Sequence, residues 1–503
     1  MAFANNYLRI VAPVLVVLST SALIWFGNGL DPWWPLFWFA PLPVLVFALR
    51  SSWRASALTA FLPMLLGSLN MWHYFQVLEA PTYVWFSVYL AMGLLWAGAV
   101  LLFRALVLRR ALWSALLAFP ATWVAEEYLR NFVTPHGTAG SLAYTQLKFL
   151  PFLQLASVTG PWGMSFVLLL FPAGLAIALH LRKTAPRQAS RIGSTVLTLT
   201  ALVLTIGWAR LGQTAPAQQV TVGLIASDTQ ANVRPATEGA ATERLFRDYS
   251  AQAEQLAARG AQVIVLPEKT GTIVDPTAGP SEAVLQSIAD KTGSTIVAGV
   301  DHIASPARYN EARIYQPKIP VLRYEKHHML PPFEDIFKPG TTITLLNKPS
   351  ATSSTTWGVA ICKDMDFSQL AREYGNAGAG LLLVPGWDFN VDRSWHGHIA
   401  IMRGVESGFS IAHAAKNGYL TVSDDRGRIV AETRSDSAGF ATLLATVPDA
   451  HEATLYLLLG DWFAWLSIAI FALTLLQRIR LRDEIPQATE GHRRPVAAYG
   501  SSR

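Results

Sequence analysis

The sequence predicts a polytopic α-helical membrane protein that carries one α/β domain. The chain has 503 residues, a mean hydropathy of +0.30 and only 15% charged residues, which an ordinary soluble protein does not combine. It contains apolar runs of about 20 residues, the length at which a helix crosses about 30 Å of hydrocarbon. Between the last two runs lies a long stretch with the charge density and alternating pattern of a folded, water-exposed domain.

Eight apolar runs are candidate transmembrane helices. They lie near residues 7–27, 33–49, 55–76, 82–103, 111–128, 162–181, 193–212 and 453–477. We expect the first run to remain as an anchor, because its flank holds only Arg9 and no small-residue cleavage site follows it. The predicted domains are a seven-helix membrane domain at 1–212, an extracytoplasmic domain at 213–450, a C-terminal helix at 451–482 and a polar tail, typical of disorder, at 483–503.

Basic residues predict the orientation in the membrane. They follow the second, fourth, sixth and eighth runs, at Arg50, Arg54, Arg104, Arg109, Arg110, Arg182, Lys183, Arg187, Arg191, Arg478, Arg480 and Arg482. Because Lys and Arg near membrane ends stay in the cytoplasm, the long domain is expected on the other side, in a bacterium the periplasmic side of the inner membrane. The net charge of +6 then reflects topology, and no nucleic-acid partner is expected.

The long domain alternates apolar strands with helices. Runs such as QVTVGLIAS, AQVIVLPE, STIVAGV and GLLLVPG read as strands, and helices are predicted near 241–259, 366–375 and 395–408. In the first part of this domain strands alternate with helices, and the later part is rich in strands. This order favours a layered α/β sandwich.

Cys362 is the only cysteine of the chain. It has no partner for an intramolecular disulfide, and a lone cysteine is most often a small buried apolar residue. Here it ends the strand WGVAIC, and a helix is predicted to begin near Ser368. Helix N–H groups close to the sulfur would stabilise the thiolate, so Cys362 is a candidate nucleophile.

Two further ionisable residues end apolar strands, Glu268 in VIVLPE and Lys326 in VLRYEK. Taken singly, the first is most often a solvated carboxylate and the second a surface charge. Open sheets present their chemistry at strand ends, which makes the set of Glu268, Lys326 and Cys362 a candidate site.

The stretches LPE, ARYNEA, YEKHHMLPPFE and GVAIC, together with the run at 396–430, resemble the nitrilase or carbon–nitrogen hydrolase superfamily. The resemblance covers 219–447 and implies an αββα sandwich with a Glu–Lys–Cys triad. It implies Glu268 as the base, Lys326 as the cation facing the oxyanion and Cys362 as the nucleophile. Glu334 matches a supporting glutamate of the superfamily, and Asp364 is expected to support charge near the triad.

The membrane half adds a second resemblance. WVAEEYLR with Trp123, the run GSLAYTQ and the run PFLQLASVTGPWGMSFVLLL are similar to the apolipoprotein N-acyltransferase family. That family implies acyl transfer from a phospholipid, through a Cys thioester, to the N-terminal amine of a diacylglyceryl-cysteine apolipoprotein. It also implies a monomer in the lipid bilayer without a cofactor. Glu127, Arg130 and Trp387 are candidate substrate contacts, although a structural ion pair of Glu127 with Arg130 is equally expected.

The sequence departs from that family directly after the nucleophile, where Lys363 and Asp364 replace a Tyr–Glu pair. Lys363 either lowers the pKa of the thiol or points to solvent. The loop LPPFE and the stretch WDFN at 387–390 also match only loosely.

Two alternative functions therefore stay open: a membrane-tethered carbon–nitrogen hydrolase (amidase) or acyltransferase acting on another amine, and a non-catalytic membrane scaffold. A transporter is disfavoured, because internal charges are few and no repeat is visible.

No metal site is expected from the histidines. His327 and His328 are adjacent on a predicted strand and would point to opposite faces, while His396 and His398 lack a clear third ligand.

Overall fold

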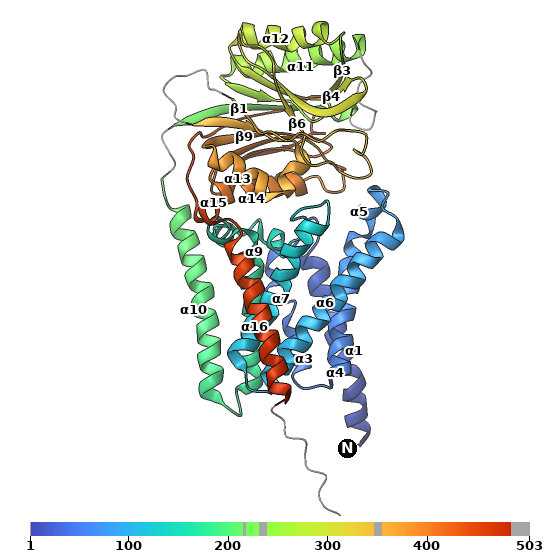
Figure 1. The fold of residues 1–503 in the computed structure, drawn as a ribbon, viewed down its shortest axis with the longest axis vertical. Coiled ribbons are helices and arrows are strands. Elements are labelled where there is room, and N and C mark those ends of the chain that lie inside the picture. Colours follow the sequence, from blue (N-terminus) through green and yellow to red (C-terminus); the bar gives the residue numbers. More distant parts are fainter. Residues whose placement is uncertain (1, 215–217, 231–238, 347–354, 484–503) are drawn as a thin grey trace, which may run out of the picture.

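A computed structural model describes residues 2–214, 218–230, 239–346 and 355–483. A helical bundle forms one half of the molecule, and an α/β domain is stacked on one end of it (Figure 1). The predicted tail lies outside the described residues, except for Asp483 at the end of the last helix.

Ten helices account for most of the bundle. They are α1 (Ala2–Gly27), α2 (Trp34–Phe37), α3 (Leu42–Ala48), α4 (Trp53–Gly67), α5 (Trp72–Val77), α6 (Thr82–Leu108), α7 (Leu112–Val133), α9 (Ala156–Leu181), α10 (Pro186–Leu211) and α16 (Trp462–Asp483). Short turns η1 (Ser68–Met71), η2 (Leu142–Gln146) and α8 (Leu150–Leu153) connect them.

Five segments of the described residues are long and apolar enough to cross a membrane. They are Trp53–Val77, Thr82–Leu108, Ala156–Leu181, Pro186–Leu211 and Trp462–Leu481. The second predicted span is broken into α2 and α3, which have Pro35 and Pro43 in their first turns, where the missing N–H is tolerated. In α7 the charged residues Glu126, Glu127 and Arg130 lower the hydropathy. The count of eight spans thus stays a prediction.

The helices face two environments. In the interior, the indole rings of Trp96 and Trp123 meet edge to face, with centroids 5.1 Å apart. On α10 and α16, by contrast, apolar side chains such as Leu197, Trp208 and Leu473 are more than half exposed. Apolar surface of this extent on long helices is suited to contact with lipid.

The α/β domain has four layers. One sheet has the strand order β13-β1-β2-β4-β5-β6, with β3 also paired to β4, and the other has the order β12-β11-β10-β9-β8-β7. The strands of the first sheet are β1 (Gln219–Ala226), β2 (Val263–Val265), β3 (Gly271–Val274), β4 (Thr295–Ala304), β5 (Ala307–Tyr315), β6 (Leu322–Glu325) and β13 (Ala441–Pro448). Those of the second are β7 (Thr344–Leu346), β8 (Thr356–Val359), β9 (Ala379–Trp387), β10 (Ser410–Lys416), β11 (Tyr419–Ser423) and β12 (Ile429–Arg434).

Helices cover the outer face of each sheet. Helices α11 (Ala240–Ala258) and α12 (Gly279–Thr292) lie on the side away from the bundle, and α13 (Ser368–Asn376) and α14 (Trp395–Ser407) lie on the side facing it (Figure 1). Buried side chains such as Val222, Val265 and Leu383 fill the space between the sheets. The predicted sandwich is therefore present, with α12 as a helix that the sequence patterns did not reveal.

Direct contacts join the two halves. The Thr138 backbone N–H and hydroxyl both donate to the carbonyl oxygen of Asp366, at 2.9 and 2.6 Å. Gln154 Nε2 donates to the Arg426 carbonyl oxygen at 2.8 Å. The segment after Cys362 is thus held against the membrane half of the chain.

Candidate active site

A buried ion-pair network lies where β2 and β6 end. Lys326 Nζ donates to Glu268 Oε1 at 2.9 Å and to Glu334 Oε2 at 2.7 Å. All three side chains are buried. Asn310 on β5 donates through Nδ2 to Glu268 at 2.6 Å and to Glu334 at 2.7 Å, so it fixes both carboxylates around the lysine. The structure thus brings together three of the residues singled out in the sequence.

Electrostatics keep this lysine charged. Burial alone favours the neutral amine, but the carboxylates of Glu268 and Glu334 outweigh it and raise the pKa of Lys326. Glu334 is also paired with Lys269, whose Nζ donates to it at 2.6 Å. The two lysines overcome the effect of burial and lower the pKa of Glu334, so a fixed cation stands between two carboxylates.

Cys362 sits at a strained turn after β8. Strand β8 ends at Val359, and Cys362 begins the one-turn 3₁₀ helix η4 (Cys362–Asp366) with φ of +43°. A residue with a side chain rarely adopts positive φ, and such strain concentrates at functional sites. The thiol donates to the Trp387 carbonyl oxygen at 3.8 Å. This contact differs from the predicted one, because η4 separates the sulfur from the first turn of α13.

The thiol is protonated at rest. Burial raises the pKa of Cys362, the negative charge of Glu268 raises it further, and Lys326 only partly opposes them. The expectation that helix N–H groups stabilise the thiolate is therefore not met, and the thiol needs a base to react. Glu268 is the carboxylate that exerts the largest charge effect on the sulfur.

Two protein-family models match separate parts of this chain. The family model described as "Apolipoprotein N-acyltransferase N-terminal domain" matches residues 20–174, and that described as "Carbon-nitrogen hydrolase" matches residues 219–453. The chain belongs to the apolipoprotein N-acyltransferase family. This confirms the resemblance seen in the sequence, because the acyltransferase domain and the nitrilase-type domain occur in one chain.

Curated members of the apolipoprotein N-acyltransferase family align with most of the chain. One from Geobacter metallireducens is 28% identical over 71% of this chain and 73% of its own length. Another, from Gloeobacter violaceus, is 26% identical over 93% of this chain and 94% of its own length. Among solved structures, an amidase from Nesterenkonia sp. is 21% identical, with a TM-score of 0.39, over 48% of this chain and 94% of that protein.

Lys363, which departs from the apolipoprotein N-acyltransferase pattern, takes neither of its two expected positions. Its side chain is buried, and Nζ lies 3.2 Å from Asp366 Oδ2 and 3.3 Å from His136 Nδ1. It therefore points neither to the sulfur nor to solvent. The cation is held at the contact between the α/β domain and the loop after α7.

Asp364 ties the nucleophile turn to the loop that follows Lys326. Its Oδ2 accepts from the Ile361 N–H at 3.0 Å and from the Tyr324 hydroxyl at 2.7 Å. Its Oδ1 accepts from the backbone N–H of His328 at 2.9 Å. These contacts hold the turn at Cys362 against the segment that contains Lys326.

Glu127 and Arg130, the candidate substrate contacts on α7, bind other groups of the membrane half. Glu127 accepts hydrogen bonds from the Leu142 N–H at 2.7 Å and from Trp123 Nε1 at 3.0 Å. Arg130 instead pairs with Glu126 at 2.9 Å, so the expected pairing of Arg130 with Glu127 is wrong. Glu126 and Glu127 both lie at a distance from Arg130 along the helix that allows an ion pair. Glu127 is instead bonded to the Leu142 N–H, and this contact decides that Arg130 pairs with Glu126.

Around Trp387 lie two lysines that the sequence patterns did not single out. Lys416 Nζ is 3.7 Å from the centre of the Trp387 ring, and Lys269 Nζ is 5.4 Å from it. Burial lowers the pKa of Lys416 to about 7, although Glu268 acts in the opposite direction. The sequence patterns also did not single out Asn310. It lies in the stretch ARYNEA, which resembles the superfamily, but nothing in that stretch indicated a role for its side-chain amide.

The histidines require two corrections. His327 and His328 follow β6, which ends at Glu325, and so lie in a loop and not on a strand. His328 stacks on Phe367 with ring centroids 3.6 Å apart. His396, which was expected together with His398 to lack a clear third ligand, lies beside Asp388 and Asp392.

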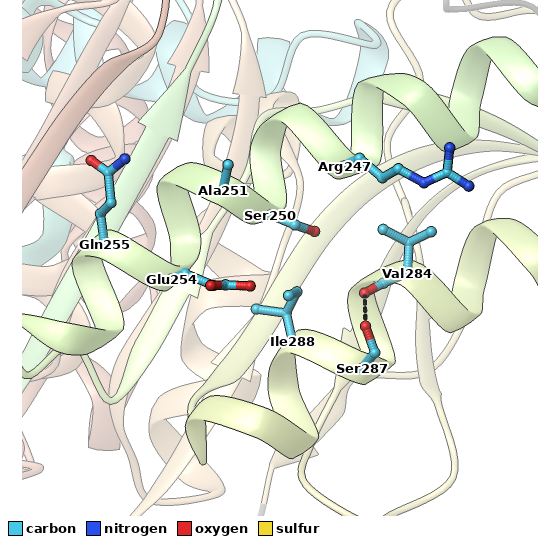
Figure 2. Close-up of a pocket in the computed structure, with 8 residues that line it drawn as sticks. All are labelled: Arg247, Ser250, Ala251, Glu254, Gln255, Val284, Ser287 and Ile288. Atoms are coloured by element: carbon cyan, nitrogen blue, oxygen red, sulfur yellow. Dashed lines mark hydrogen bonds between the residues drawn. The ribbon is translucent and has the colours of Figure 1, made fainter.

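A hollow elsewhere in the domain is separate from this site. It has a volume of about 510 Å³ and lies between α11 and α12, with Ser250, Glu254 and Ile288 among its lining residues (Figure 2). These helices cover the sheet on the side away from the bundle (Figure 1). It therefore contributes nothing to the environment of Cys362.

Proposed function

We propose that this acyltransferase moves an acyl chain from a membrane phospholipid, through a thioester on Cys362, to the N-terminal amine of a diacylglyceryl-cysteine apolipoprotein. The observation that carries the proposal is the buried bridge of Lys326 between Glu268 and Glu334, beside a protonated thiol, in a chain of this family. The catalytic residues are Glu268, Lys326 and Cys362, with Glu334 and Asp364 in support.

In the first half of the reaction, Glu268 accepts the thiol proton and the sulfur attacks the ester carbonyl carbon of the phospholipid. The bond between carbon and the alcohol oxygen breaks, and the leaving lysophospholipid takes the proton from Glu268. A thioester on Cys362 remains. In the second half, the acceptor amine attacks the carbonyl carbon of the thioester and gives its proton to Glu268. The carbon–sulfur bond breaks, and the leaving sulfur takes that proton to restore the thiol. Two half-reactions through one nucleophile predict ping-pong kinetics.

Lys326 is proposed to stabilise the negative oxygen in both halves. It stays charged and immobile because two carboxylates and a buried setting hold it. A fixed charge in a site shielded from water stabilises developing charge strongly, since it needs no reorganisation during the reaction. The backbone N–H after Cys362 is a second donor in this proposal.

We further propose that the protein lies in the bacterial inner membrane as a monomer with about eight spans. The proposed domains are 1–212, 213–450, 451–482 and 483–503, with the catalytic domain on the periplasmic side. The basic residues after alternate apolar runs support this orientation. The second sheet, with α13 and α14, faces the bundle, which is where a lipid substrate would arrive (Figure 1). The turn that begins at Cys362 contacts the membrane half through Asp366, whose carbonyl oxygen accepts from Thr138.

The test of the function uses purified full-length protein with acyl-labelled phosphatidylethanolamine and a diacylated lipopeptide. The expected products are lysophospholipid and a triacylated peptide. Release of free fatty acid without triacylated peptide would favour the hydrolase alternative. Cys362→Ala protein serves as the matched control, because it keeps the lipid-binding surface while it lacks the nucleophile.

A further inference from the structure

Beside the nucleophile lies a buried acidic cluster that the proposed mechanism does not use. Asp388 follows Trp387 at the end of β9, Asp392 lies in the next loop, and His396 is in the first turn of α14. One ligand atom of each lies within 4.8 Å of those of the other two. Asp388 is 0% exposed and Asp392 is 2% exposed.

Two of the three carboxylates in this region have basic partners. Asp392 Oδ2 lies 3.2 Å from His396 Nε2, and Asp366 Oδ2 lies 3.2 Å from Lys363 Nζ. The third, Asp388, has no hydrogen-bond partner for either side-chain oxygen within the described part of the chain. A buried carboxylate without a hydrogen-bond partner is costly. The basic group of the cluster, His396, is paired with Asp392, so both oxygens of Asp388 are open to a donor from outside the chain.

The unpaired carboxylate lies close to the reaction. The backbone carbonyl of Trp387, the preceding residue, accepts the hydrogen bond of the Cys362 thiol at 3.8 Å. When it is ionised, the Asp388 carboxylate raises the pKa of the same thiol. From the membrane half, the Tyr74 hydroxyl on α5 lies within range of the charges of Asp392, Asp366, Cys362 and Asp388. A cation held by Asp388 is therefore near both the sulfur and the bundle.

We propose that Asp388, assisted by Asp392, binds the primary ammonium group of a substrate and sets the specificity of this site for amines. This deepens the proposed function and rests on it. An ammonium has three N–H donors, and the two free oxygens of Asp388 offer matching acceptors. The acceptor amine is the favoured source, because its nitrogen must reach the thioester on Cys362. An α-amine with a pKa of about 7.7 to 8.0 arrives mainly as the ammonium.

The electrostatics of Asp388 agree with this assignment. Burial raises the pKa of Asp388, and the negative charge of Asp392 adds to it, while His396 opposes them. Without a cation the acid keeps its proton. An arriving ammonium stabilises the ionised form, and the proton of the acid leaves to solvent. Asp388 then takes one proton from the bound ammonium, which frees the lone pair of its nitrogen to attack the thioester on Cys362.

The test separates the two half-reactions in Asp388→Asn and wild-type full-length protein. Acylation of Cys362 by phosphatidylglycerol, followed by intact-protein mass, is expected to be at least as fast as in wild type, because any negative charge of Asp388 beside the thiol is removed. The KM for the diacylated lipopeptide is expected to rise about 10-fold or more, the size of a lost charge-assisted hydrogen bond. Capture of the acyl group by hydroxylamine, which is neutral at pH 7, is expected to stay at the wild-type rate. Asp436→Asn, an exposed aspartate paired with Arg434, is the matched control.

A second arm distinguishes the source of the ammonium. If Asp388→Asn slows acylation by phosphatidylethanolamine and not by phosphatidylglycerol, the ammonium belongs to the donor lipid and ammonium binding is supported. If acylation by both lipids and the KM for lipopeptide match wild type, the proposal is overturned. Loss of wild-type activity on chelation, with recovery on adding Mn²⁺, would overturn it in favour of a metal ion.

Two further measurements keep the outcome interpretable. A long-chain primary amine should compete with the lipopeptide for wild-type protein, whereas the corresponding alcohol should not. Equal competition by the amine and the alcohol contradicts the proposal. This measurement needs only wild-type protein, so it holds even if the Asp388→Asn variant fails to fold. The absence of any thioester on wild-type Cys362 would instead remove the proposed function itself. The two failures are therefore distinguishable.

Discussion

Lys363 Nζ lies 3.2 Å from Asp366 Oδ2, so the cation next to the nucleophile is turned away from the sulfur. The backbone carbonyl of the same aspartate accepts from Thr138 of the membrane half. The substitution of a lysine at this position thus changes the contact between the two halves of the molecule. We infer that it stabilises this contact and leaves the acid–base chemistry of Cys362 to Glu268 and Lys326.

Lys363→Met is expected to lower the free energy of unfolding by about 3 kcal/mol or more, because it leaves Asp366 buried without its partner. Chemical denaturation of the detergent-solubilised protein measures the loss. The double variant Lys363→Met, Asp366→Asn should recover much of it. The pH midpoint of Cys362 alkylation should match wild type, and a clear shift would show that Lys363 does act on the thiolate.

Cys362→Ser is expected to abolish thioester formation and acyl transfer without unfolding the protein. The hydroxyl is close in size to the thiol but is far harder to ionise, and the raised pKa of Cys362 shows that this site does not favour the anion. Intact-protein mass after incubation with phospholipid checks for the acyl adduct, and thermal unfolding checks the fold. Transfer at the wild-type rate would refute the assignment of the nucleophile.

Glu268→Gln separates the two effects that Glu268 has on Cys362. Removing its negative charge lowers the pKa of the thiol, because the largest charge that opposes Lys326 is then gone. Alkylation of Cys362 by iodoacetamide at neutral pH should therefore become faster, while transfer falls to background because no base remains. Alkylation rates and lipopeptide assays on the same preparation measure both. Slower alkylation would contradict the proposed electrostatic role.

His413 on β10 is expected to make stability depend on pH. Burial, and then the nearby charges of His396 and His398, lower the pKa of His413 to about 3, whereas in the unfolded chain it is about 6.5. The unfolded state therefore binds the proton first, and this stability is complete above pH 6.5 and is lost as pH falls toward 3. His413→Leu should flatten that slope in denaturation curves taken between these limits. An unchanged slope would assign the acid sensitivity to other groups.

The sequence predicted much of the site because the relevant signals are local. Glu268, Lys326 and Cys362 each lie at or just beyond the end of an apolar strand, and the resemblance to the nitrilase superfamily added Glu334. Asn310 and Lys269 carried no such signal. Their importance comes from the pairing of β4 with β5 and from the bend after β2, which place both against Glu334.

Apolar run length and strand-end position, which depend only on neighbours along the chain, determined the membrane half, the sandwich and the candidate triad. The tertiary structure alone decided which charged side chains form pairs. It paired Arg130 with Glu126, turned Lys363 toward Asp366, and left Asp388 buried without a partner among the described residues. The reason is physical: periodicity tells which face a side chain occupies, but the partner on that face comes from packing between segments distant in sequence.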